Sequence, residues 1–165
     1  MALVHQIFTI SFAKLAPPKN KTNKGDIMDL GHIVAEFNWL AIFVAAASAF
    51  VLGGAWYAKG LFGNAWMQYV GLTEEDTNNA NMPRIFGGAF VLQFIAAIML
   101  ATLLGTDSTW LSGLHTGLVV GIGFVATAYC VTYLFEQRPL RLFMINAGYN
   151  VVLMAIMGTI IGAWH

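Results

Sequence analysis

Four long apolar stretches dominate this chain after about residue 38, and none of them contains Asp, Glu, Lys or Arg. Each reaches or approaches the roughly 20 residues that a helix needs to cross about 30 Å of hydrocarbon. A water-soluble helix of this length shows a charged face, and these stretches show none. The stretches are Trp39 to Tyr57, Ile85 to Gly105, Gly113 to Phe135 and Leu142 to Trp164.

This pattern predicts an all-α protein, an integral membrane four-helix bundle. The predicted spans cover about residues 38–58, 84–105, 113–135 and 141–163, within a membrane domain at 38–165. We expect residues 1–37 to be a partly flexible N-terminal leader. Its first part, residues 1–27, is polar toward its end and precedes a second candidate start at Met28, so we expect it to be either dispensable or not part of the native protein.

The connection between spans one and two has its own periodicity. Its apolar positions recur at helical spacing, which predicts a short amphipathic helix in the membrane interface. Thr73 follows, with three acidic residues directly after it, which is typical of an N-cap and a first helical turn. The apolar positions of the amphipathic helix are Phe62, Ala65, Trp66, Tyr69 and Val70.

Composition and charge narrow the function classes. The chain has 165 residues, of which 58% are hydrophobic and 10% charged, whereas soluble domains carry about 25% charged residues. The net charge of zero gives no reason to expect nucleic acid as a partner. We expect membrane lipid as the surroundings. The only cysteine, Cys130, lies inside a predicted span and cannot form an internal disulfide.

Basic residues predict the orientation. Two connections contain them: 58–84 has Lys59 and Arg84, and 136–141 has Arg138 and Arg141. The connection at 106–112 has no Lys or Arg. The positive-inside rule then places these two connections in the cytoplasm and both termini outside, in the cytoplasmic (inner) membrane. The leader has as many lysines as these connections have basic residues, which argues against this orientation. Most of those lysines lie too far from the first span to count fully.

Small residues recur every four positions in three spans. Lipid tails are as apolar as Leu, so close backbone approach and interhelical hydrogen bonds hold membrane helices together. The stripes predict tight helix packing, either within the chain or with another copy, and we expect a homo-oligomer. The glycines of these stripes are Gly53, Gly113, Gly117, Gly121, Gly158 and Gly162.

Polar side chains within the spans are the candidate functional residues, since such groups are costly in hydrocarbon. They either join helices by hydrogen bonds or line a polar cavity open to the cytoplasm. No acid or base lies deep in a span, which argues against a proton relay. No catalytic set, metal-ligand spacing or cofactor motif is present in the sequence. The candidate cavity residues are Gln93, Tyr129, Asn146, Tyr149, Asn150 and, at the end of span three, Glu136.

Several short sequences occur together along the chain: Asn38–Ile42, Leu52–Tyr57, Leu61–Met67, Gly71–Asp76, Phe135–Leu140, Ile145–Asn150, Met157-Gly158 and Gly162–Trp164. Their combination resembles one family of small membrane proteins, known as domain of unknown function 1761. The resemblance covers about Asn38 to Trp164 and implies a multi-pass membrane protein without an assigned activity. The family pattern often has His where this chain has Asn150, so a titrating role of such a His would be absent here.

Three functions fit the sequence. The first is a non-enzymatic membrane component that associates with itself. The second is a small transporter or channel subunit with a polar cavity between Gln93 and Asn150. The third is a lipid-binding protein or membrane enzyme that uses Asn146, Tyr149 and Glu136.

Overall fold

The computed structural model describes residues 35–164. The expected leader at 1–37 therefore lies outside the described residues, except for its last three positions. Within the described part there is no strand, and four helices are long and apolar enough to cross a membrane. The prediction of an all-α four-helix membrane bundle is confirmed.

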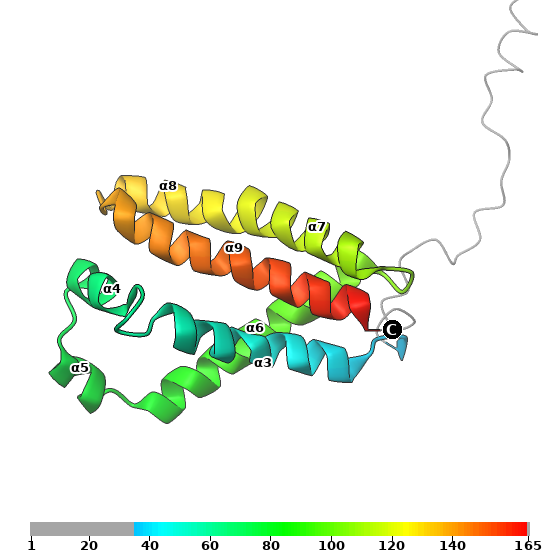
Figure 1. Cartoon of the computed structure of the whole chain (residues 1–165), viewed down its shortest axis with the longest axis horizontal. Helices are drawn as coiled ribbons and strands as arrows, with labels where there is room; N and C mark the ends of the chain where they lie inside the picture. The colour runs from blue at the N-terminus through cyan, green and yellow to red at the C-terminus, as the bar shows by residue number, and fades with distance from the viewer. Residues whose placement is uncertain (1–34, 165) are drawn as a thin grey trace, which may run out of the picture. The chain divides into compact units, whose positions relative to one another are not determined.

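The chain runs back and forth through these four helices (Figure 1). One of the four is continuous but changes its winding, from α7 through the π-helix η1 to α8. Two short helices, α4 and α5, connect the first span to the second, and we call the end of the bundle where they lie the α4 end. The elements are α3 (Trp39–Trp56), α4 (Gly63–Val70), α5 (Glu74–Asn79), α6 (Met82–Leu104), α7 (Trp110–Val120), η1 (Gly121–Ala126), α8 (Thr127–Phe135) and α9 (Leu140–Ala163).

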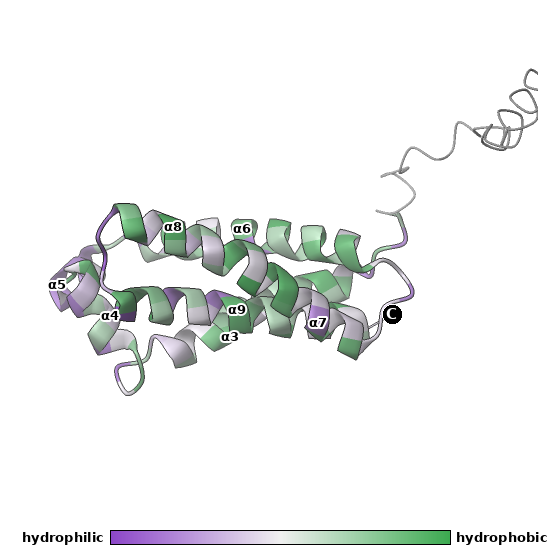
Figure 2. Cartoon of the chain, turned by 90° about the horizontal axis from the view of Figure 1, so that it is seen from above, coloured by the Kyte–Doolittle hydropathy of each residue, from purple (hydrophilic) through white to green (hydrophobic). Residues whose placement is uncertain are grey.

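Polar residues begin most of these helices. The side chains of Asn38 and Asn81 accept hydrogen bonds from backbone N–H groups in the first turns of α3 and α6. Thr73 and Asp76 form a capping box at α5, which confirms the predicted helix start there. A second capping box, between Thr109 and Ser112, starts α7 three residues earlier than predicted. Colouring by hydropathy shows polar residues gathered in the connections and apolar residues along the long helices (Figure 2).

Helix α9 contacts all the other long helices and has more buried residues than any of them. Leu153 and Met157 of α9 are fully buried. They pack against Ile42 and several alanines of α3 and against Leu100 of α6. Alanines at these contacts let the helix axes come close, which increases the number of van der Waals contacts.

Helices α3 and α6 also contact each other through phenylalanine rings. Phe90 of α6 lies between Phe43 and Phe50 of α3, with ring centroids 5.5 and 6.1 Å away. Phe86 and Phe94 extend the same face of α6 by one turn in each direction and contact Phe50 and Trp39. Ring pairs of this kind contribute about 0.5–1.5 kcal/mol each beyond the burial of area.

Five glycines bring α7 and α9 into backbone contact, and we call this contact the glycine seam (Gly113, Gly117, Gly121, Gly158 and Gly162). A Cβ atom added to Gly113 would overlap the carbonyl group of Gly158, and one added to Gly158 would overlap that of Gly113. At Gly117 the added atom would overlap the carbonyl of Met154, and at Gly162 that of Thr109. The structure places this contact within one chain.

Gly53 of α3 has a different surrounding from the glycine seam. A Cβ atom there would lie 3.5 Å from the hydroxyl of Tyr149, which is ordinary van der Waals contact. The position therefore leaves room for a tyrosine ring and does not bring two backbones together.

We predict that Gly113→Ala destabilises the folded protein in detergent by about 1–3 kcal/mol, because α7 and α9 must move apart to admit the methyl group. Unfolding by a denaturing detergent, followed by circular dichroism, measures the change.

Gly123→Ala and Gly87→Ala are matched controls, because nothing lies within 4 Å of a Cβ atom at either position. Each should change the free energy of unfolding by no more than about 0.5 kcal/mol. Equal losses in Gly113→Ala and in the controls would contradict the glycine seam.

Candidate functional site

Polar side chains from three long helices meet near the α4 end of the bundle. Asn146 of α9 is at the centre: its side-chain oxygen accepts a hydrogen bond from the hydroxyl of Tyr57 at 3.0 Å. Its side-chain nitrogen donates to the hydroxyl of Tyr133 of α8 at 2.8 Å. One amide thus joins the end of α3 to α8 through α9.

Tyr149 adds a second link between α9 and α3. Its hydroxyl donates to the backbone oxygen of Ala49 at 3.0 Å, and its ring lies 5.3 Å from that of Tyr57. We call Tyr57, Tyr133, Asn146 and Tyr149 the tyrosine–asparagine cluster. All four residues are half-buried in the single chain.

The indole of Trp56 makes a third link between α3 and α9. Its Nε1 donates to the backbone oxygen of Ile145 at 3.1 Å. Helix carbonyl groups can accept a second hydrogen bond, so these contacts to Ala49 and Ile145 need not break the helices.

The π-helix η1 begins at Gly121, the last glycine of the seam on this helix, and ends before the tyrosines of α8. Residues four apart drift around an α-helix by about 40° per step, because a turn takes about 3.6 residues. The seam positions Gly113, Gly117 and Gly121 would therefore turn away from α9 if the same winding continued. A π-helical turn takes more residues, which brings a later position of the same spacing, Tyr133, back toward α9, where its hydroxyl accepts the hydrogen bond from Asn146.

The residues predicted for a polar cavity take different places in the structure. Asn146 and Tyr149 belong to the cluster. Tyr129 packs edge-on against the ring of Tyr133 at 5.7 Å, and Asn150 donates to the backbone oxygen of Asn146 at 2.8 Å.

Two other predicted cavity residues form no hydrogen bond or ring contact with the cluster among the described residues. Glu136 follows α8, is exposed and pairs with Arg138 at 3.2 Å. Gln93 of α6 is half-buried and makes no hydrogen bond with the residues that the structure describes. The structure thus brings together part of the predicted set, on α8 and α9, and joins it to α3 rather than to α6.

Trp56, Tyr57 and Tyr133 are not among the cavity residues that the sequence predicts. Tryptophan and tyrosine at the end of a membrane helix are typical of the interfacial belt, so their position alone does not indicate hydrogen bonds between helices. The available signal was spacing: Tyr129 and Tyr133 continue the four-residue interval of the glycine stripe.

Hydroxyl and amide groups give the cluster a neutral hydrogen-bonding character. Such groups bind uncharged polar molecules or hold helices together, and they supply no strong acid or base. In residues 35–164, no group of three or more His, Cys, Asp or Glu side chains could hold a metal ion.

Apolar grooves lie away from the cluster, on either side of Ile156 of α9. One groove of about 480 Å³ runs along α3 from Val44 to Ala55, and one of about 290 Å³ runs along α7 at Leu114 and Leu118. Their linings are almost entirely apolar, which suits contact with lipid tails.

We predict that Asn146→Ala lowers the free energy of unfolding in detergent by about 1–2 kcal/mol, because two interhelical hydrogen bonds are lost together. Tyr57→Phe and Tyr133→Phe should each lose about half of this.

Tyr129→Phe is the matched control, since the Tyr129 hydroxyl has no hydrogen bond among the described residues. Its expected change is within about 0.5 kcal/mol. A loss in Tyr129→Phe as large as that in Tyr133→Phe would contradict the bonding through Asn146.

Comparison with known proteins gives one result. A family model described as "Protein of unknown function (DUF1761)" matches residues 40–162. No curated protein matches the chain, and no solved structure does.

Proposed function

Because this chain belongs to the protein family DUF1761, whose description assigns no activity, we propose its function from the geometry: a non-enzymatic membrane component that acts by association. The observation that carries the proposal is the bonding of Asn146. Its side-chain oxygen accepts a hydrogen bond from Tyr57, and its side-chain nitrogen donates one to Tyr133. The polar groups near the α4 end are thus used to join helices, which is what a structural or binding component requires.

Self-association is the second part of the proposal. The glycine seam is occupied within the chain, so another copy must use the outer surfaces of the bundle. On α6, Leu92 and Ile95 are exposed, and Gly87 and Gly88 have nothing within 4 Å of an added Cβ atom. This supports close approach of a second helix to α6, because small residues favour helix contacts in lipid.

We predict that fluorescently labelled protein in sparse liposomes bleaches in two or more steps per complex. Gly88→Leu should raise the share of single-step complexes, because a large side chain blocks the approach.

Gly60→Leu is the control, since Gly60 also has open space but lies in the connection before α4. It should leave the step distribution unchanged. Single steps for the unaltered protein at every protein-to-lipid ratio would rule out self-association.

The third part of the proposal is an inner-membrane location with both termini outside. Lys59, Arg84, Arg138 and Arg141 all belong to connections or helix ends at the α4 end. The connection between α6 and α7 has no Lys or Arg. The positive-inside rule supports a cytoplasmic α4 end.

Cysteine labelling tests this orientation in a Cys130→Ala background. Asp107→Cys, in the exposed part of the connection between α6 and α7, should react with an impermeant thiol reagent in intact cells. The matched variant Glu75→Cys, at the α4 end, should react only after the cells are permeabilised. The reverse pattern would contradict the proposed orientation.

A transporter or channel subunit is the second candidate function. It is favoured by one observation: Tyr129 and Asn150 lie half-buried beside the cluster. A neutral polar solute that displaced Tyr57 from Asn146 would find hydroxyl and amide groups on three helices. For such a transporter or channel, the structure with these hydrogen bonds formed would be the closed state.

A further inference from the structure

Helix α4 lies against the part of the bundle that carries the tyrosine–asparagine cluster. The ring of Trp66 packs edge-on against that of Tyr57, with centroids 5.5 Å apart. Phe62, directly before α4, packs against Trp56 at 4.9 Å. On α4 itself, Tyr69 interacts with Arg141 in the first turn of α9. The helix thus covers Tyr57, whose hydroxyl binds Asn146.

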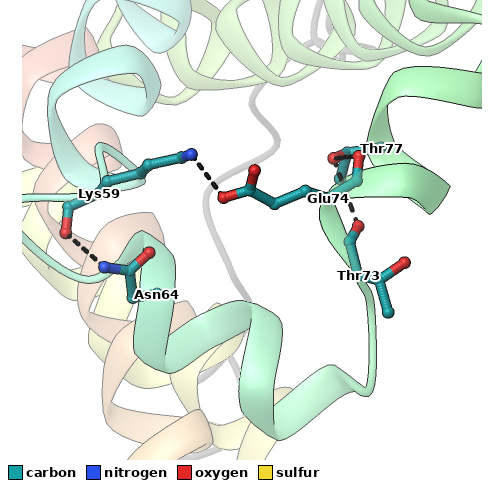
Figure 3. A network of polar contacts seen from close by, with 5 residues as sticks. All are labelled: Lys59, Asn64, Thr73, Glu74 and Thr77. Atoms are coloured by element: carbon teal, nitrogen blue, oxygen red, sulfur yellow. Dashed lines mark hydrogen bonds and ion pairs between the residues drawn. The ribbon is translucent and has the colours of Figure 1, made fainter.

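An ion pair joins the two connections that flank α4 (Figure 3). Lys59 lies before α4 and Glu74 begins α5 after it, and the ammonium and carboxylate groups are 2.5 Å apart. Asn64, in the first turn of α4, donates to the backbone oxygen of Lys59 at 3.1 Å. The ion pair therefore closes a loop of chain that contains the whole of α4.

This ion pair is exposed, so its surroundings can weaken it. About two thirds of each side chain is accessible to solvent, 68% for Lys59 and 66% for Glu74. Dissolved salt screens such pairs. The hydrogen bond from Lys59, and then its charge, hold the pKa of Glu74 below its usual range. The lowered pKa keeps Glu74 charged at neutral pH, so the pair can be weakened by salt or broken by acid that protonates Glu74.

A glycine at each end of α4 has a backbone position that a larger residue would not fit. Gly71 ends α4 with a φ of 77°, in the left-handed region that favours glycine. At Gly63 a Cβ atom would overlap the backbone oxygen of Tyr57. The tight turn at Gly63 fixes one end of α4 close to Tyr57, whereas the far end is held to the rest of the protein by side-chain contacts.

We propose that α4 is a movable cover over the tyrosine–asparagine cluster, and that the ion pair between Lys59 and Glu74 is the latch that keeps it closed. When the latch opens, Trp66 leaves Tyr57, and water reaches Tyr57 and Asn146 from the α4 end. The inference goes beyond the proposed function, which does not require α4 to move.

Hydrogen exchange of the full chain in nanodiscs of neutral lipid, at low salt, tests the latch. Lys59→Gln and Glu74→Gln should each speed exchange of the amides in α4 by about two- to fivefold, the range expected for an exposed ion pair. High salt should have the same effect on the unaltered protein and no further effect on the variants. Amides of the glycine seam should exchange as before, which shows that the bundle remains folded.

Glu75→Gln is the matched control, because Glu75 lies beside Glu74 on α5 and makes no ion pair with a described residue. It should leave exchange in α4 unchanged. Unchanged exchange in Lys59→Gln and Glu74→Gln, or an equal increase in Glu75→Gln, would overturn the latch.

Oxidative footprinting tests the cover without altering the cluster. In Glu74→Gln the side chains of Tyr57 and Trp66 should be modified faster, by a similar factor, than in the unaltered protein, while Tyr149 of the same cluster reports how far water enters. Faster exchange in α4 with no change at Tyr57 would show a latch that covers nothing, and would overturn the proposal.

Discussion

The backbone contact between α7 and α9 is the interaction on which the rest of this structure depends. In lipid, burying leucine against leucine gains little over burying it against acyl chains, so helices need closer contacts than large side chains allow. The glycine seam supplies them, because the carbonyl groups of one helix lie against the glycines of the other. With α7 fixed on one side of α9, the opposite sides of α9 remain for α3 and α6, whose alanines fill the core around Leu153 and Met157.

The π-helix connects this packing to the candidate site. The seam needs glycine at every fourth position, and that spacing drifts around an α-helix. One stretch of wider winding, Gly121–Ala126, restores the direction of the following residues. Tyr133 reaches Asn146 from the same long helix whose other half, away from the α4 end, carries the seam glycines. π-helical insertions occur often at functional sites, and here the insertion separates a half that packs from a half that carries hydroxyl groups.

Hydrogen bonds and ring contacts then join the α4 end to the same framework. Asn146 links α3 and α8 through α9, and Trp66 of α4 packs against the tyrosine that Asn146 binds. These contacts become more exposed with distance from the seam, from its buried glycines, through half-buried hydrogen bonds, to the exposed ion pair of Lys59. A gradient of this kind lets an outer element move while the bundle stays intact.

The sequence predicts well the parts of this fold that depend on apolar segments and on local capping residues. Charge-free stretches predict the four spans within a few residues, and Thr73 with Asp76 predicts the start of α5, since caps are local chemistry. Four-residue spacing predicts that Gly113, Gly117 and Gly121 pack closely, but spacing cannot name the partner helix.

The candidate site was harder to predict, because it depends on tertiary geometry. The sequence of Gly121–Ala126 does not distinguish a π-helix from an α-helix. It therefore does not predict that Tyr133 faces Asn146. A tyrosine at a helix end is typical of an interfacial anchor in membrane proteins, so its position does not indicate the hydrogen bond between Tyr57 and Asn146. Gln93 and Asn150 are both polar residues within spans, yet the sequence does not show whether two such side chains meet.

The distance between α7 and α9, measured by electron spin resonance in lipid, tests the central claim most directly. Spin labels replace the exposed residues Val119 and Val152 in a Cys130→Ala chain. The account predicts one short, narrow distance that remains when the labelled protein is diluted with excess unlabelled protein, because the seam forms within a chain. Loss of that distance on dilution, or a long and broad distribution, would contradict it.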